Sequence, residues 1–166
     1  MNISKQKIEK ILSDMKECIE SFGLPIIGEI STDERPTIIS KFQYEHYGFA
    51  IAAIYHPEGE LVEISIYHGE APKNKIKPIC ELMNLINAHI MSGHFFVDPS
   101  RGGMSFRAAV HVPDSLNKEE FEWALKQVMG ASYRFFPMIV EQLFTDDDPE
   151  EIIKRVLEQQ AKEVNS

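Results

Sequence analysis

Three consecutive segments between Thr37 and Ile66, in which residues alternate with period two, constrain the fold more than any other feature. They cover residues 37–44, 47–55 and 62–66 and are rich in β-branched and aromatic side chains. The connection Pro57-Glu58-Gly59-Glu60 between the second and the third is short and built from turn residues. Strands joined by such short turns predict an antiparallel meander.

Helical periodicity precedes and follows the meander. Apolar residues recur at i, i+3 and i+4 spacing over residues 5–22 and again over residues 79–90. Two more strands are predicted around the turn-rich segment Asp98–Gly103. A long third helix begins near Asn117, whose side chain and that of Glu120 form a capping-box pattern.

The C-terminal part of the chain contains two further signals. Pro137 lies well inside the third helix, so a kink or break is predicted near residues 133–137. Asp148 is a good N-cap and Pro149 a good first helical residue, which together predict a fourth helix.

The predicted order is α-β-β-β-α-β-β-α plus a C-terminal tail helix. Helices and antiparallel strands in this order indicate the α+β class, with helices packed on an antiparallel sheet of about five strands. A length of 166 residues fits one domain. We expect that domain to cover residues 1–144, and residues 145–166 to form an acidic-capped helical extension.

The chain is acidic, with a formal net charge of −9. This charge disfavours nucleic acid and anionic membranes as partners, because both are bound through cations. Residues 141–166 hold eight acidic and three basic residues, so more than half of the excess lies in the last 26 residues of the chain. There, acidic residues also complement the N-terminal dipole of the fourth helix, which weakens acidity as evidence about a partner.

The sequence predicts a cytoplasmic protein without catalytic residues, cofactor or metal. No secretory signal is visible, no apolar run reaches the ~18–20 residues of a membrane helix, and Cys18 and Cys80 form no CxxC motif. The six histidines do not show the spacing of a metal site. A GxSxG motif is absent, and neither cysteine lies at a predicted helix N-terminus that would activate it.

Arg107 is the most notable polar residue, because alternation places it on the strand face opposite Phe106. From there it either crosses a groove to a carboxylate or lies on the solvent face. Aromatic residues nearby either form core or line a cleft. The candidate interaction surface consists of Asn84, Asn87, Phe95, Phe96, Phe106, Arg107 and His111.

Several segments resemble the YbjN-domain family, which is assigned to bacterial sensory transduction. The resemblance is most specific over residues 81–107, where an apolar helix with two asparagines is followed by glycine, an aromatic strand and Asp98. Gly103-Met104-Ser105-Phe106-Arg107 and Tyr133-Arg134-Phe135-Phe136-Pro137 fit the same pattern, and the whole resemblance covers about residues 5–144.

The resemblance implies a fold similar to that of type III secretion chaperones, which have the same element order. Those chaperones are small, acidic, usually homodimeric and non-enzymatic, and they bind extended client segments on their sheet and helix surfaces. The tail helix departs from this pattern and could cover the surface that a client would use.

We therefore expect a non-enzymatic cytoplasmic protein that binds a protein or peptide partner in a chaperone-like or regulatory role in sensory transduction. The alternative is a small-ligand sensor or enzyme with a cleft near Arg107, His111, Asn84 and Asn87. A deep pocket with convergent polar groups would favour the alternative, and a shallow open groove the first interpretation. We also expect a homodimer that forms through a sheet edge or the surface of the second helix.

Overall fold

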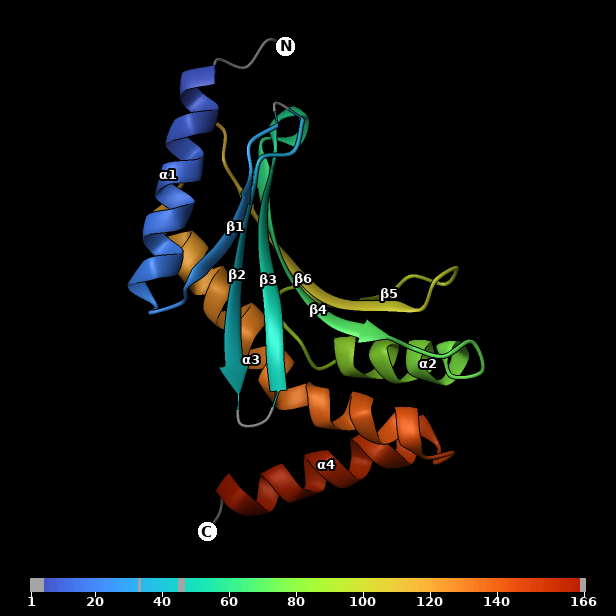
Figure 1. Ribbon diagram of the computed structural model, residues 1–166. Coiled ribbons are helices and arrows are strands. Elements are labelled where there is room, and N and C mark those ends of the chain that lie inside the picture. The colour runs from blue at the N-terminus through green and yellow to red at the C-terminus, as the bar shows by residue number, and fades with distance from the viewer. Residues whose placement is uncertain (1–4, 33, 45–46, 165–166) are drawn as a thin grey trace.

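The computed structural model describes residues 5–32, 34–44 and 47–164, which form a six-stranded antiparallel sheet and four α-helices (Figure 1). The predicted α+β class is confirmed, with six strands where about five were expected. In chain order the elements are α1 (Lys5–Ser21), β1 (Ile26–Ile30), β2 (Thr37–Tyr44), β3 (Tyr47–His56), the short 3₁₀ helix η1 (Pro57–Gly59), β4 (Leu61–Glu70), α2 (Ile76–Asn87), β5 (His94–Val97), β6 (Gly103–His111), α3 (Lys118–Phe144) and α4 (Pro149–Val164).

The strands lie in the order β1-β2-β3-β4-β6-β5, so that β1 and β5 form the two edges. The first four strands are a meander, as the alternating segments predict. β6 then pairs with β4, and β5 pairs with β6 from outside. The additional strand is β1, in which a bulge between Ile26 and Gly28 interrupts the alternation that would reveal a strand.

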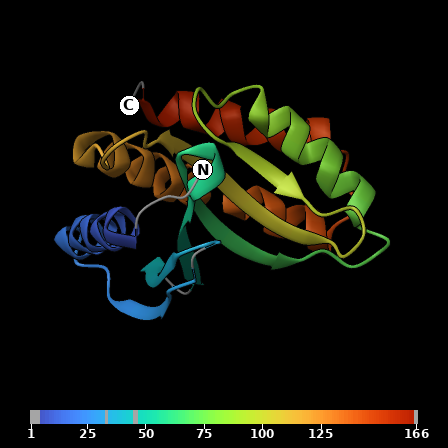
Figure 2. The ribbon, with the colours of Figure 1, turned by 90° about the horizontal axis from the view of Figure 1, so that it is seen from above.

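The helices lie on one side of the sheet and leave its other face uncovered (Figures 1 and 2). Alternate residues of the central strands point to the covered side, where Ile51, Ile64, Ile66 and Phe106 are completely buried. α3 packs across β4 and β6, and α1 packs against β1 to β3. The sheet thus has a single buried face, and its other face is available for contacts outside the domain.

α2 packs against β5, α3 and α4. Ile152 and Ile153 of α4 are buried in the same hydrophobic core as the rest of the domain. Lys75, just before α2, donates to the carbonyl oxygen of Thr145 and forms a 2.7 Å ion pair with Asp146. These contacts hold the start of α4 against α2, on the side of the molecule away from the uncovered sheet face.

The helix starts agree with the predicted caps. The Asn117 side chain accepts a hydrogen bond from the backbone N–H of Glu120, and Asp148 accepts one from Glu150. α3 continues through Pro137 without the predicted break, although its ribbon bends part-way along (Figure 1). A proline inside a helix removes one backbone hydrogen bond and commonly kinks the helix without ending it.

Candidate functional site

The uncovered face of the sheet is lined by small side chains in its centre. Ile39, Ala52, Ser65 and Arg107 lie opposite one another on β2, β3, β4 and β6. Opposite residues of antiparallel strands point to the same face, so the four form one row across the sheet. Ala52 and Ser65 in the middle of this row are small, and the row is therefore a trough between Ile39 and Arg107.

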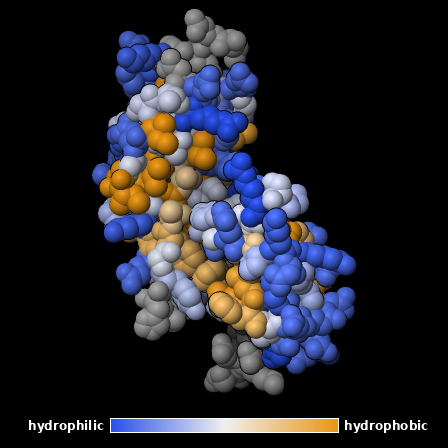
Figure 3. Space-filling view, turned by 45° about the vertical axis from the view of Figure 1, so that its right-hand side comes forward, coloured by the Kyte–Doolittle hydropathy of each residue, from blue (hydrophilic) through white to orange (hydrophobic). Residues whose placement is uncertain are grey.

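One half of this face is aliphatic. Ile27 and Ile30 of β1 are about half exposed, at 54% and 48%, and Ile39 and Ile54 are partly exposed beside them. Figure 3 shows hydrophobic surface gathered on this side of the molecule. Exposed isoleucines that gather in this way are typical of an interaction surface rather than of scattered surface residues.

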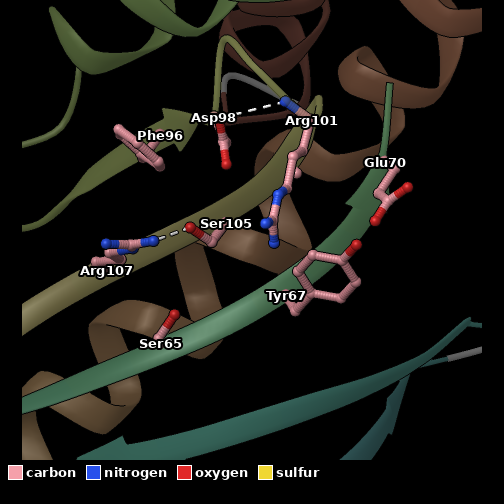
Figure 4. Close-up of a pocket in the computed structure, with 9 residues that line it drawn as sticks. Ser65, Tyr67, Glu70, Phe96, Asp98, Arg101, Ser105 and Arg107 are labelled. Atoms are coloured by element: carbon pink, nitrogen blue, oxygen red, sulfur yellow. Dashed lines mark hydrogen bonds between the residues drawn. The ribbon is translucent and has the colours of Figure 1, made fainter. Parts of the chain in front are cut away.

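The other half contains a shallow hollow of about 300 Å³ (Figure 4). Its floor is formed by Ser65, Gly103 and Ser105, and larger side chains surround it. The surrounding residues are Tyr67, Glu70, Phe96, Asp98, Arg101 and Arg107. They come from β4, β5, β6 and the β5–β6 loop, so the strand order brings together segments separated by up to about forty residues.

Arg107 is held in place by three neighbours. Its guanidinium carbon lies 4.6 Å from the centre of the Phe96 ring, and its Nε donates to Ser105 Oγ at 3.0 Å. Glu63 Oε1 is 3.8 Å from the same Nε, so Arg107 does cross to a carboxylate, while it also lies on the solvent-facing side of the sheet. Stacking and the hydrogen bond fix the orientation of the guanidinium before any ligand binds.

The β5–β6 loop forms another wall of the hollow. Asp98 Oδ1 accepts hydrogen bonds from the Ser100 hydroxyl at 2.6 Å, the Ser100 N–H at 2.8 Å and the Arg101 N–H at 3.3 Å. These bonds, with the Ser100 hydroxyl contributing most, lower the pKa of the Asp98 carboxyl. The Arg101 guanidinium extends from the loop towards Ser105 and Tyr67 (Figure 4).

Glycine is required where this loop contacts the rest of the sheet. Gly102 has φ +78°, and a Cβ there would overlap the carbonyl oxygen of Ala71. In turn, Ala71 donates its N–H to the Gly102 carbonyl at 2.8 Å. The loop is thereby fixed against the segment that connects β4 to α2.

The residues of the predicted interaction surface are distributed over three environments. Phe96 and Arg107 border the hollow, whereas Phe95 and Phe106 are buried in the core at 3% and 0% exposure. His111 is exposed at the end of β6, opposite Leu61. The surface that remains as a proposal is therefore centred on Phe96 and Arg107.

The two asparagines of α2 differ in role. Asn84 is exposed, whereas Asn87 donates to the Phe95 carbonyl oxygen at 3.0 Å and accepts from the Phe95 N–H at 2.7 Å. The Asn87 amide thus satisfies the backbone N–H and carbonyl oxygen of Phe95 on the outer edge of β5. Neither asparagine lines this hollow, and nor does His111.

The described residues show few features of a catalytic centre. Burial is the main cause that raises the pKa of the Cys18 thiol to about 11, and burial also raises that of Cys80. Among the residues placed by the structure, no three His, Cys, Asp or Glu side chains gather as metal ligands. In the same described part of the chain, no helix is long and apolar enough to cross a membrane.

Sequence reasoning did not identify most of the hollow. Ser65 and Tyr67 belong to β4, and they meet Arg101 at the hollow only because β4 pairs with β6. Alternation was the one available signal for the hollow. Phe96 alternates with Phe95 and Val97, and Arg107 alternates with Phe106, so each is predicted to lie on the solvent-facing side of its strand.

Comparison with known proteins identifies similarity over most of the chain. The model of the YbjN family, described as "Putative bacterial sensory transduction regulator", matches residues 13–141. The chain matches none of the curated proteins significantly.

Solved structures with the same fold include YbjN from E. coli, with a TM-score of 0.51 and 12% identity over 78% of this chain and 87% of that one. The ExsC–ExsE complex matches with a TM-score of 0.54 and 15% identity over 80% and 95% of the two chains. An uncharacterised protein from Methanothermobacter thermautotrophicus matches with a TM-score of 0.54 and 13% identity over 79% of this chain and 97% of that one. At these identities the similarity concerns the fold, and it confirms the predicted secretion-chaperone-like architecture.

Proposed function

The chain belongs to the YbjN family, and on this basis we propose that it is a non-enzymatic regulator that binds a protein or peptide partner. The observation that carries the proposal is the uncovered sheet face, in which exposed isoleucines and a polar hollow lie on either side of a trough of small residues. A flat face of this kind suits an extended or helical segment better than a small metabolite, which needs a deep, enclosing pocket.

Two other observations support protein binding. One of the proteins with this fold, ExsC, has been solved in a complex with ExsE. In the present chain, α4 packs on α2 and α3 and lies away from the uncovered face, so the tail helix does not obstruct it. Residues 145–166 are in this proposal an extension that completes the packing around α2, while residues 1–144 provide the binding domain.

The assignment as a non-enzyme rests on the chemistry of the candidate nucleophiles and bases. A thiol with a raised pKa is a poor nucleophile at neutral pH. The net charge of −9 supports a protein rather than a nucleic acid or an anionic membrane as the partner. The two unbridged cysteines are those of a reducing compartment, which supports a cytoplasmic location.

We further propose that two copies associate through β1. The outer edge of β5 is occupied by Asn87, and part of α2 packs against α4, which favours β1 as the edge that pairs with a second copy. Its exposed Ile27 and Ile30 lie beside this edge, so such a contact would continue the aliphatic half of the uncovered face into the second copy.

The variant Ala52→Arg tests the role of the uncovered face. The arginine would fill the trough without disturbing the core, and we expect it to abolish capture of the partner proteins that the wild type recovers from its native cell. Glu119→Arg, an exposed substitution on α3, introduces the same side chain elsewhere and is expected to leave capture unchanged. Equal capture by wild type and Ala52→Arg would refute binding at this face.

A further inference from the structure

The hollow contains more uncommitted hydrogen-bond donors than acceptors. The four N–H groups of the terminal nitrogens of Arg107 make no hydrogen bond with the described residues, and neither does any part of the Arg101 guanidinium. The Ser65 hydroxyl is likewise without a partner among them, and the Ser105 hydroxyl accepts from Arg107 and so keeps its own proton to donate.

Fewer acceptors than donors line the hollow. Asp98 Oδ1 already receives three hydrogen bonds within its loop. Glu70 lies near Tyr67, and burial together with this carboxylate raises the pKa of the Tyr67 hydroxyl. A ligand that brings acceptors can therefore use many free donors, whereas one that brings donors meets fewer acceptors.

The charges favour a singly charged acceptor. Two guanidinium groups, Arg101 and Arg107, and two carboxylates, Asp98 and Glu70, line the hollow, and Glu63 adds a third carboxylate beside Arg107. Because the carboxylates are in excess by one, a doubly charged phosphate would meet more net repulsion than a singly charged group. A carboxylate is the better fit, and its planar shape matches the fork of an arginine.

The length of the trough determines the spacing between the two groups of the ligand that contact its ends. Ile39 lies three strand spacings from Arg107 along one row, or about 14 Å. An extended peptide spans that distance in about four residues at ~3.3 Å per residue. Residues four apart in an extended segment project to the same side, so one segment can reach both ends of the row.

We propose that the hollow receives an aspartate or glutamate side chain of the partner protein, and that an aliphatic residue four positions away packs against Ile39 and Ile54. The inference deepens the proposed function and rests on it. The partner segment crosses the strands over Ala52 and Ser65, with its carboxylate between Arg107 and Arg101.

A displayed library of random decapeptides, flanked by glycine and serine, provides the probe. Wild-type protein is expected to select peptides in which Asp or Glu lies four positions from Leu, Ile or Val. Changing that Glu to Gln in a selected synthetic peptide, acetylated and amidated at its ends, should weaken binding at least about tenfold, because a charge-assisted hydrogen bond is lost.

The protein variants complete a thermodynamic cycle. Arg107→Met keeps an unbranched apolar side chain without the guanidinium and should weaken binding of the Glu peptide by a similar factor, with no further loss for the Gln peptide. Lys73→Met removes one exposed positive charge that does not line the hollow and should have no effect. Glu63→Gln removes a carboxylate that competes for Arg107 and should strengthen binding by about two- to fivefold.

The outcomes distinguish the proposed carboxylate site from the proposed binding of a partner at the uncovered face. Selected peptides without acidic enrichment, or peptide and protein substitutions whose effects multiply independently, would overturn the carboxylate site and leave the binding face intact. Failure to select any peptide, together with unchanged partner capture by Ala52→Arg, would overturn partner binding at the uncovered face. Thermal unfolding of each variant shows that a lost interaction is not a lost fold.

Discussion

His68 is the most unusual single residue in the core. It is 8% exposed and packs against the rings of Phe49, Phe95 and Phe136. Neither ring nitrogen has a hydrogen-bond partner within the described structure. Burial lowers the pKa of the imidazole to about 4, because the charged form loses its hydration there.

This histidine makes stability depend on pH. The His68 imidazole binds a proton near pH 6.5 in the unfolded chain and only near pH 4 in the folded chain. Its contribution to the free energy of unfolding is therefore fully present above pH 6.5 and is lost as the pH falls towards 4. The shift corresponds to about 3 kcal/mol. Denaturant unfolding at pH 7 and pH 4.5 should show this loss in the wild type and a much smaller one in His68→Leu.

A matched control is available in His89, which is exposed. His89→Gln should retain the pH dependence of the wild type. If His68→Leu also retained it, another group would be responsible for the acid sensitivity.

At the scale of the elements, the junction between α2 and β5 determines which sheet edge is open. Asn87 lies at the end of α2 and pairs with both the N–H and the carbonyl of Phe95, as a neighbouring strand would. Because its amide satisfies these groups, β5 offers little free backbone for pairing with another chain.

Replacement of Asn87 by alanine should therefore destabilise the protein by about 1–3 kcal/mol and speed up hydrogen exchange at the Phe95 amide. Asn84→Ala, one turn earlier on the exposed side of the same helix, should change stability by less than about 0.5 kcal/mol. Hydrogen-exchange mass spectrometry and denaturant unfolding measure both effects. Similar behaviour of the two variants would show that the Asn87 hydrogen bonds do not hold β5.

The elements themselves could be predicted where local patterns determine them. Alternation located β2, β3 and β4, and the capping residues Asn117 and Asp148 located the starts of two helices. β1 was missed because Ile26-Ile27-Gly28-Glu29-Ile30 has adjacent isoleucines and a bulge in place of strict alternation. Its strand character depends on pairing with β2.

The candidate site was much less predictable than the elements. Sequence reasoning singled out Arg107 and Phe96, which alternation places on the outer face. It did not identify Arg101 or Ser65, because their meeting depends on the β4–β6 register. The structural role of Asn87 was equally hidden, since a helix end and a strand edge meet only through tertiary packing.

At the scale of the whole molecule, the arrangement predicts a dimer through β1. Light scattering should give about twice the chain mass of 19.0 kDa. Ile27→Lys places a charge on the proposed interface and should yield the monomer, since charged side chains on an edge oppose pairing. Phe144→Lys, at an exposed position on α3, should remain a dimer. A wild-type mass near that of one chain would exclude this association.

The fixed β5–β6 loop has a consequence for the kinetics of binding. Ala71 and Asp98 hold the loop through main-chain hydrogen bonds to Gly102 of 2.8 and 2.7 Å. The loop backbone therefore loses its conformational freedom when the chain folds rather than when a partner arrives. Association should then proceed without a slow rearrangement on this side, and partners of different affinity should differ mainly in how long they stay bound.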